Sequence, residues 1–144
     1  KYGEDQVHIW RRSYDIPPPL LQENDKRHPR LYEKFKNIND DLPVGESLKN
    51  VIYRLKPFWT EYVNNIIQNG GSHLIVAHSN SLRAIIKILD QLSDKEIMNI
   101  NIPTGVPLVY TLGENLNIKN KEYLIDEKKL KSKQDMITRQ GKTK

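Results

Sequence analysis

Apolar residues over residues 46–67 recur at spacings of three and four, which is the pattern of an amphipathic helix. The positions that share this spacing are Leu48, Val51, Ile52, Leu55, Trp59, Tyr62, Val63 and Ile66. Pro57 lies inside the pattern and removes one backbone donor, so we expect a kink or a break there. The turn residues Asn69 to Gly71 then end the predicted helix.

A short apolar run follows at residues 73–77 (HLIVA), and its apolar residues are continuous rather than alternating. This pattern is typical of a buried strand in a parallel sheet. Residues 82–92 predict the next helix, and residues 106–112 and 117–125 predict two antiparallel strands. Residues 4–13 predict another short helix. Helices that alternate with strands indicate an α/β fold in which helices cover a mostly parallel sheet.

Two polar segments interrupt or follow these elements. Three successive prolines, at residues 17–19, end the first helix, and residues 20–44 are polar without periodicity, so we expect a long irregular loop. Residues 127–144 carry seven Lys or Arg against two acids and contain no aromatic residue. We expect this segment to be a basic, mobile tail, and nothing in it indicates base stacking on nucleic acid.

Composition narrows the class of protein. The 144 residues fit one compact domain, and the absence of cysteine excludes disulfides and thiolate metal ligands. No apolar run approaches the roughly 20 residues that span a bilayer, and the N-terminus has no signal-peptide core. The first residue is not methionine, so we expect a fragment or a processed product. The net charge of +5 favours an anionic partner.

The first candidate for chemistry is His78, which follows the predicted strand directly and precedes a predicted helix. Ligands of open α/β sheets bind at the carboxyl ends of strands, and a helix N-terminus favours anions. Ser79 and Asn80 are small enough to let a ligand approach the backbone. Taken alone, however, such a histidine is more often a hydrogen-bonded structural residue, and the polar residues after it can simply cap the helix.

Three arginines are further candidates. Arg11 and Arg12 can form a fork for phosphate if they face the same cleft as the histidine, whereas a solvated pair is the commoner arrangement. Arg83, in the first turn of the predicted helix, is more often an ordinary surface or ion-pairing residue. The remaining histidines do not show metal-ligand spacing.

Four motifs occur in the order KYGEDQVHIWRRSYDIPPP, GESL, AHSNSLRA and NIPTGVPLVY, and the chain closes with QGKTK. Together they closely resemble the C-terminal half of the 2,3-bisphosphoglycerate-dependent phosphoglycerate mutases, which are part of the histidine phosphatase superfamily. The resemblance covers nearly the entire chain. It implies a three-layer α/β fold with helices on both faces of a mostly parallel sheet. Residues 1–144 would then be the C-terminal part of a single domain of this kind.

The resemblance also implies an activity. The family consists of cytoplasmic isomerases of glycolysis and gluconeogenesis that interconvert 3-phosphoglycerate and 2-phosphoglycerate. They work through a phosphohistidine, use 2,3-bisphosphoglycerate as the primer and need no metal. The motifs give Arg11 and Arg12 as ligands of the substrate's carboxylate and phosphate, and Ser79 and Asn80 as the phosphate-binding turn. His78 is then the second active-site histidine, which hydrogen-bonds the transferring phosphoryl group. Full-length members commonly form homodimers or homotetramers; neither nucleic acid nor a membrane is an expected partner.

The chain departs from the family in three places. It has no RHG motif with the nucleophilic histidine and no match for the acid/base glutamate, so we expect it to be inactive by itself. Ser79 stands where the family usually has glycine. The segment between Pro19 and Glu46 is shorter than usual, either through a deletion or through missing residues. Two alternatives stay open: bisphosphoglycerate mutase, which shares the motifs, and a non-catalytic anion-binding or interaction module if the chain is complete.

Overall fold

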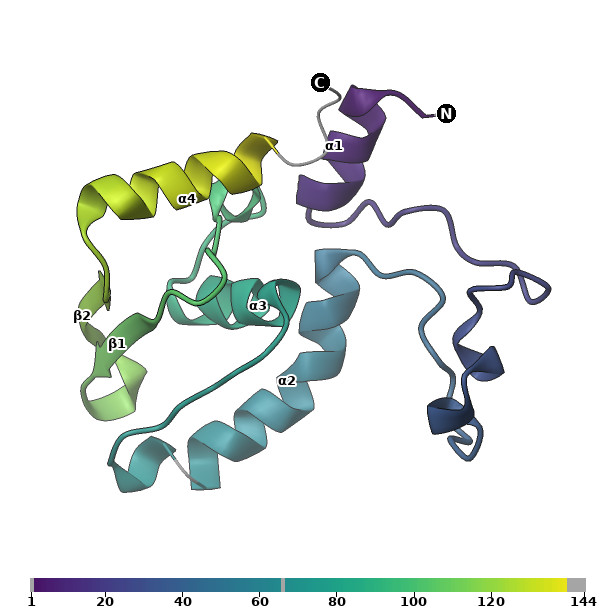
Figure 1. The fold of residues 1–144 in the computed structure, drawn as a ribbon. Helices are drawn as coiled ribbons and strands as arrows, with labels where there is room; N and C mark the ends of the chain where they lie inside the picture. Colours follow the sequence, from purple (N-terminus) through teal and green to yellow (C-terminus); the bar gives the residue numbers. More distant parts are fainter. Residues whose placement is uncertain (1, 66, 140–144) are drawn as a thin grey trace.

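The computed structural model describes residues 2–65 and 67–139 of the chain (Figure 1). Its helices and strands are, in chain order, α1 (Glu4–Arg12), α2 (Leu48–Asn65), α3 (Ser79–Leu89), β1 (Leu108–Leu112), β2 (Ile118–Tyr123) and α4 (Glu127–Arg139). Short 3-10 helices are η1 (Pro29–Leu31), η2 (Glu33–Phe35), η3 (Ile67–Asn69), η4 (Glu96–Asn99) and η5 (Glu114–Leu116). The predicted helix at 4–13 and the predicted antiparallel strands are confirmed.

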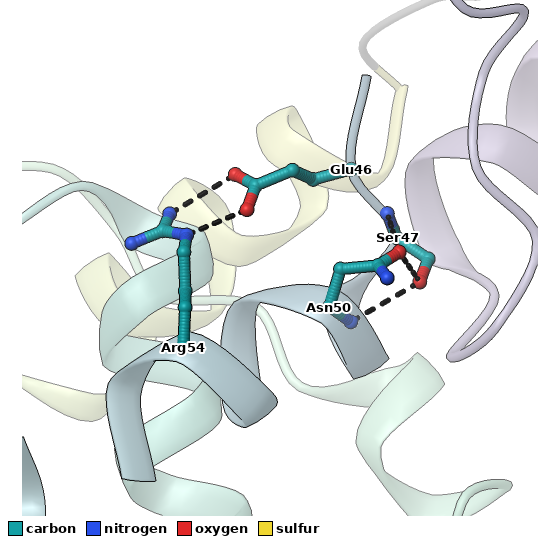
Figure 2. Close-up of polar contacts among 4 residues, drawn as sticks. All are labelled: Glu46, Ser47, Asn50 and Arg54. Atoms are coloured by element: carbon teal, nitrogen blue, oxygen red, sulfur yellow. Dashed lines mark hydrogen bonds and ion pairs between the residues drawn. The ribbon is translucent and has the colours of Figure 1, made fainter. Parts of the chain in front are cut away.

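The start of α2 is determined by a reciprocal pair of side-chain caps (Figure 2). The Ser47 hydroxyl accepts a hydrogen bond from the backbone N–H of Asn50 at 3.3 Å. In return, Oδ1 of the Asn50 side chain accepts from the backbone N–H of Ser47 at 3.0 Å and from its hydroxyl at 2.6 Å. This is the capping-box arrangement, with asparagine in the place of glutamate. One turn further along, the Arg54 guanidinium donates to both oxygens of Glu46 at 2.6 and 3.0 Å and ties the preceding loop to the helix.

Pro57 does not break α2. The helix runs through it over Leu48–Asn65, so the predicted break is wrong. Its ribbon bends partway along in Figure 1, as the predicted kink requires. The helix survives because Trp59 and Val63, beyond the proline, are buried against Ile85 of α3. The packing of this apolar face outweighs the loss of one backbone hydrogen bond.

The core lies mainly between α2 and α3, which pack side by side (Figure 1). It has two groups of buried residues. The first consists of Leu48, Val51, Ala84 and Ile97, and the second of Trp59, Val63 and Ile85. Ile97 belongs to η4 and has no exposed surface, so η4 closes one end of the α2–α3 pair.

Residues 73–77 do not form the predicted buried strand. They are extended and unpaired, and Leu74 and Val76 are 87% and 85% exposed, while Ile75 packs against the group around Trp59. A strand forms only beside another strand, and the sheet found in the described part of the chain is the two-stranded β1–β2 pair. The strand prediction is therefore wrong for this chain, whose fold combines helices with a small antiparallel sheet.

The β1–β2 pair is attached to the C-terminal end of α3. Its register runs from Leu108 opposite Tyr123 to Leu112 opposite Ile118, with an irregularity before the turn. Asp90, just after α3, accepts a hydrogen bond from the Tyr110 hydroxyl at 3.0 Å and pairs with the Lys121 ammonium group. Burial raises the pKa of Tyr110 far above its usual range, and the hydrogen bond and charge of Asp90 raise it further.

The predicted loop over residues 20–44 is irregular apart from η1 and η2. His28 is buried there, and its Nδ1 accepts from the Arg30 amide at 3.3 Å, so this histidine has a structural role. The segment predicted as a basic tail contains α4, which begins at Glu127. The carboxylate of Asp126, the residue before it, accepts from the backbone N–H of Lys128 at 3.0 Å. Mobility of 127–144 stays a prediction, and the closing QGKTK motif lies outside the described residues.

Candidate functional site

His78 is the N-cap residue of α3. Its Nδ1 accepts a hydrogen bond from the backbone N–H of Asn80 at 3.3 Å, and its backbone carbonyl accepts from the backbone N–H of Leu82 at 3.1 Å. A nitrogen that accepts carries no proton, so the proton of the neutral imidazole lies on Nε2. The His78 side chain is exposed, and the ring therefore presents a hydrogen-bond donor to the surroundings of the helix N-terminus.

Ser79 and Asn80 form the first turn of α3, directly after this histidine. The first backbone N–H groups of a helix have no partner inside it and lie at its positive end, which favours an anion. Ser79 is helical and is not among the described residues with positive φ. The backbone at this position is therefore accessible to any amino acid, and serine in place of glycine does not strain it.

Arg83 is buried, not on the surface as its sequence context predicts, and is 4% exposed. Its Nη2 donates to the Ile97 carbonyl at 2.8 Å and its Nη1 to Asn80 Oδ1 at 3.4 Å. In the described part of the chain no carboxylate pairs with it, and its Nε has no hydrogen-bond partner. The sequence did contain one indication of this burial, because Arg83 lies three residues before Ile86 and therefore on the same face of the helix.

Arg12 is also buried, at 8% exposure, whereas Arg11 is exposed beside it at the end of α1. The Nη2 of Arg12 donates to the carbonyl of Ile137 at 3.1 Å, in the last turn of α4. This contact is favourable because the C-terminal end of a helix carries partial negative charge. It joins the two terminal helices, whose ends lie near one another in Figure 1.

The two buried guanidinium groups influence each other. Burial, with a further contribution from the charge of Arg12, lowers the pKa of Arg83 to about 10. Burial likewise lowers the pKa of Arg12, with a contribution from the charge of Arg11. Both groups stay charged at neutral pH, and both donate to carbonyl or amide oxygens only. Concentrated positive charge without a carboxylate partner suits an anionic ligand.

The structure therefore brings three predicted site residues together, His78, Ser79 and Asn80, at the N-terminus of α3. The charge of Arg12 acts on Arg83, which donates to Asn80 of this turn and which the sequence favoured as an ordinary surface or ion-pairing residue. Hollows on the outer faces of α2 and α4 are lined by other residues. Residues 2–65 and 67–139 hold no group of three or more acidic or histidine side chains suited to a metal ion. None of the helices described is long and apolar enough to cross a bilayer.

Comparison with known proteins identifies the family. Residues 19–115 match the family model described as histidine phosphatase superfamily (branch 1). The chain is similar to proteins named 2,3-bisphosphoglycerate-dependent phosphoglycerate mutase. That of Treponema denticola is 50% identical over 145 residues, covering 100% of this chain and 59% of the relative. That of Lachnoclostridium phytofermentans is 48% identical over 143 residues, covering 99% of this chain and 57% of the relative.

The Borreliella burgdorferi protein of the same name is 46% identical over 145 residues, covering 100% of this chain and 58% of its own length. The chain thus spans less than three fifths of each of these relatives. The family model, in contrast, matches well over half of the chain. The chain belongs to branch 1 of the histidine phosphatase superfamily.

Proposed function

We propose that this chain is the C-terminal part of a 2,3-bisphosphoglycerate-dependent phosphoglycerate mutase, which interconverts 3-phosphoglycerate and 2-phosphoglycerate. The observation that carries the proposal is 50% identity to a protein of that name along the whole length of the chain. The N-terminus of α3, with the exposed ring of His78 and the buried cation of Arg83 bound to Asn80, agrees with it, because the substrate and the primer are both anions.

In this proposal the turn stabilises the phosphoryl group during its transfer. His78 donates from Nε2 to a phosphoryl oxygen, while Ser79 and Asn80 donate to the same group. Arg11 and Arg12 hold the carboxylate and phosphate of the substrate. Donors that are already fixed where negative charge develops lower the barrier without reorganisation during the reaction, which is the main contribution of the protein in phosphoryl transfer. The primer is 2,3-bisphosphoglycerate, and no step needs a metal.

The proposed whole protein has a three-layer fold whose mostly parallel sheet includes residues 73–77. The supporting observation is the unpaired, extended conformation of this segment with Leu74 and Val76 exposed. Covering one such side chain would stabilise the protein by about 1.5–3 kcal/mol. The part of the relatives that the chain does not span would supply the neighbouring strands, the nucleophilic histidine and the acid/base glutamate. The chain by itself is then inactive. The whole protein is cytoplasmic and forms homodimers or homotetramers.

The test is reconstitution of activity. The 144-residue chain is fused to the part of the Treponema denticola relative that it does not span, and interconversion of the two phosphoglycerates is measured with and without 2,3-bisphosphoglycerate. We expect turnover by the fusion only when the primer is present, and no turnover by the chain alone. Activity that requires manganese and ignores the primer would contradict the proposal.

Two alternatives have their own outcomes in this assay. Bisphosphoglycerate mutase shares the motifs, and the fusion would then show more synthase than mutase activity. A non-catalytic anion-binding module is the other alternative, since the donors at His78 and Asn80 suit an anion whether or not turnover follows. For that module, isothermal titration of the chain with phosphoglycerate would show binding, and the fusion would show no turnover.

A further inference from the structure

Arg83 connects the candidate site to the core. Its guanidinium group donates to the carbonyl of Ile97 at 2.8 Å and to Oδ1 of Asn80 at 3.4 Å. Ile97 has no exposed surface and packs among the buried residues of α2 and α3. One end of the contact is therefore fixed by close packing, and the other end reaches the first turn of α3. Because the arginine is held by the closely packed core, it restricts the movement of the Asn80 side chain in that turn.

The chemistry of the arginine determines which way the Asn80 amide faces. A guanidinium group has only donors, so it can bind the oxygen of the Asn80 amide and not its NH2 group. The Nδ2 hydrogens of Asn80 must then point away from Arg83. The backbone N–H of Asn80 is already donated to Nδ1 of His78, which leaves Nε2–H of the histidine as the outward group. Both side chains thus offer donors, and an anion is the ligand that donors bind.

We propose that Arg83 is a positioning residue that holds the Asn80 amide with its NH2 group outward, ready to bind a phosphoryl oxygen. The role given to Asn80 rests on the proposed function, whereas the role of Arg83 is additional to it. Without Arg83 the amide can rotate by half a turn and present its oxygen, which repels an anion. The positive charge of Arg83 and Arg12 also favours the anion, but charge alone does not orient the amide.

A purely structural role for Arg83 must be separated from this one. The bond to Ile97 joins α3 to η4, so loss of the arginine lowers stability whether or not Asn80 is involved. Coupling between the two residues distinguishes the roles, because a residue that acts through Asn80 has no effect once the Asn80 amide is gone. The measured quantity is the dissociation constant of inorganic phosphate.

The experiment is a double-mutant cycle by isothermal titration of the 144-residue chain with inorganic phosphate. It compares the natural chain, Arg83→Lys, Asn80→Ala and the double variant. Lysine keeps the positive charge but lacks the fork that reaches both partners. We expect Arg83→Lys to weaken phosphate binding about fivefold to tenfold in the natural chain, which is the net effect of one ordinary hydrogen bond, and less than about twofold in the Asn80→Ala chain. Arg54→Lys, which disrupts an exposed fork to Glu46, is the matched control and should leave the affinity unchanged.

A second variant leaves Arg83 in place. Asn80→Asp keeps the shape of the side chain and gives Arg83 a carboxylate, so the melting temperature should rise. It removes both outward N–H groups, so phosphate binding should weaken by about tenfold or more. This test holds even if Arg83→Lys fails to fold.

Several outcomes would overturn the proposed role of Arg83. These are an equal loss of affinity from Arg83→Lys in both backgrounds, no loss at all, natural phosphate affinity in Asn80→Asp, or a natural chain that does not bind phosphate. The mutase assay is independent of these results. If the chain shows the coupling but the fusion does not interconvert phosphoglycerates, the proposed function is overturned and the role of Arg83 stands.

Discussion

Substitution of His78 by two different amides should separate the two functions of its ring. Nδ1 caps α3 by accepting a hydrogen bond from the backbone N–H of Asn80, and Nε2 is the donor that we assign to the phosphoryl group. The short side chain of asparagine places an amide oxygen near the position of Nδ1. The longer side chain of glutamine extends its NH2 group toward the position of Nε2. His78→Asn therefore keeps the cap, and His78→Gln keeps the donor.

The two effects differ in size. The capping hydrogen bond is long, at 3.3 Å, and the side chain is exposed, so its loss in His78→Gln or His78→Ala should cost about 0.5 kcal/mol of unfolding free energy. A preorganised donor to a transferring group is worth on the order of 10²-fold or more in kcat, or about 2.7 kcal/mol. We expect this loss in His78→Ala and His78→Asn. His78→Gln should stay within about tenfold of the natural kcat, because it retains a donor.

The assays are urea unfolding of the 144-residue chain and steady-state kinetics of the active fusion with saturating primer. The expected ranking for stability places His78→Asn first and His78→Gln with His78→Ala below it, whereas the ranking for kcat places His78→Gln first. A kcat that is higher in His78→Asn than in His78→Gln would show that the assignment of the two ring nitrogens is reversed. An unchanged kcat in His78→Ala would make the histidine purely structural.

Three further predictions concern the scaffold. Ser47→Ala should lower the free energy of unfolding by about 1 kcal/mol in urea denaturation through loss of the α2 cap, and Ser132→Ala, at an exposed helical position, is the control that should change little. Ile97→Ala should lower it by about 2–5 kcal/mol, since this side chain is completely buried; a loss below that of Ile97→Val would contradict the packing. Burial raises the pKa of Tyr110 and of Tyr123, so the unfolded chain releases their protons first and stability should fall as pH rises above about 10. Urea unfolding over that pH range checks this slope, which Tyr110→Phe should reduce.

Helices α1, α2 and α3 and the hairpin were predictable because their signals are local, whereas α4 lies in the segment predicted as a basic tail. The apolar residues over 46–67 recur within a few residues of one another, and their spacing predicts nearly the observed bounds of α2. The turn between the two antiparallel strands is equally local. The motif residues at the start of α3 also lie together in the structure simply because they are neighbours in the chain.

For residues 73–77 and for Arg83, the local sequence did not predict the structure. The apolar run has the composition of a buried strand, but strand formation depends on a neighbouring strand, and the described residues do not place one beside it. Arg83 has the sequence context of a surface residue. Its burial depends on the carbonyl of Ile97, fourteen residues away in the chain.

By itself the sequence determined helices α1, α2 and α3, the hairpin and the order of motifs that marks the family, because each depends on residues near one another in the chain. Only the tertiary structure decided that Arg12 and Arg83 are buried, and that they lie close enough for their charges to interact. The physical reason is that hydrogen-bond partners and burial are properties of atoms brought together from distant segments. The burial of a charged side chain is therefore known only when those partners are known.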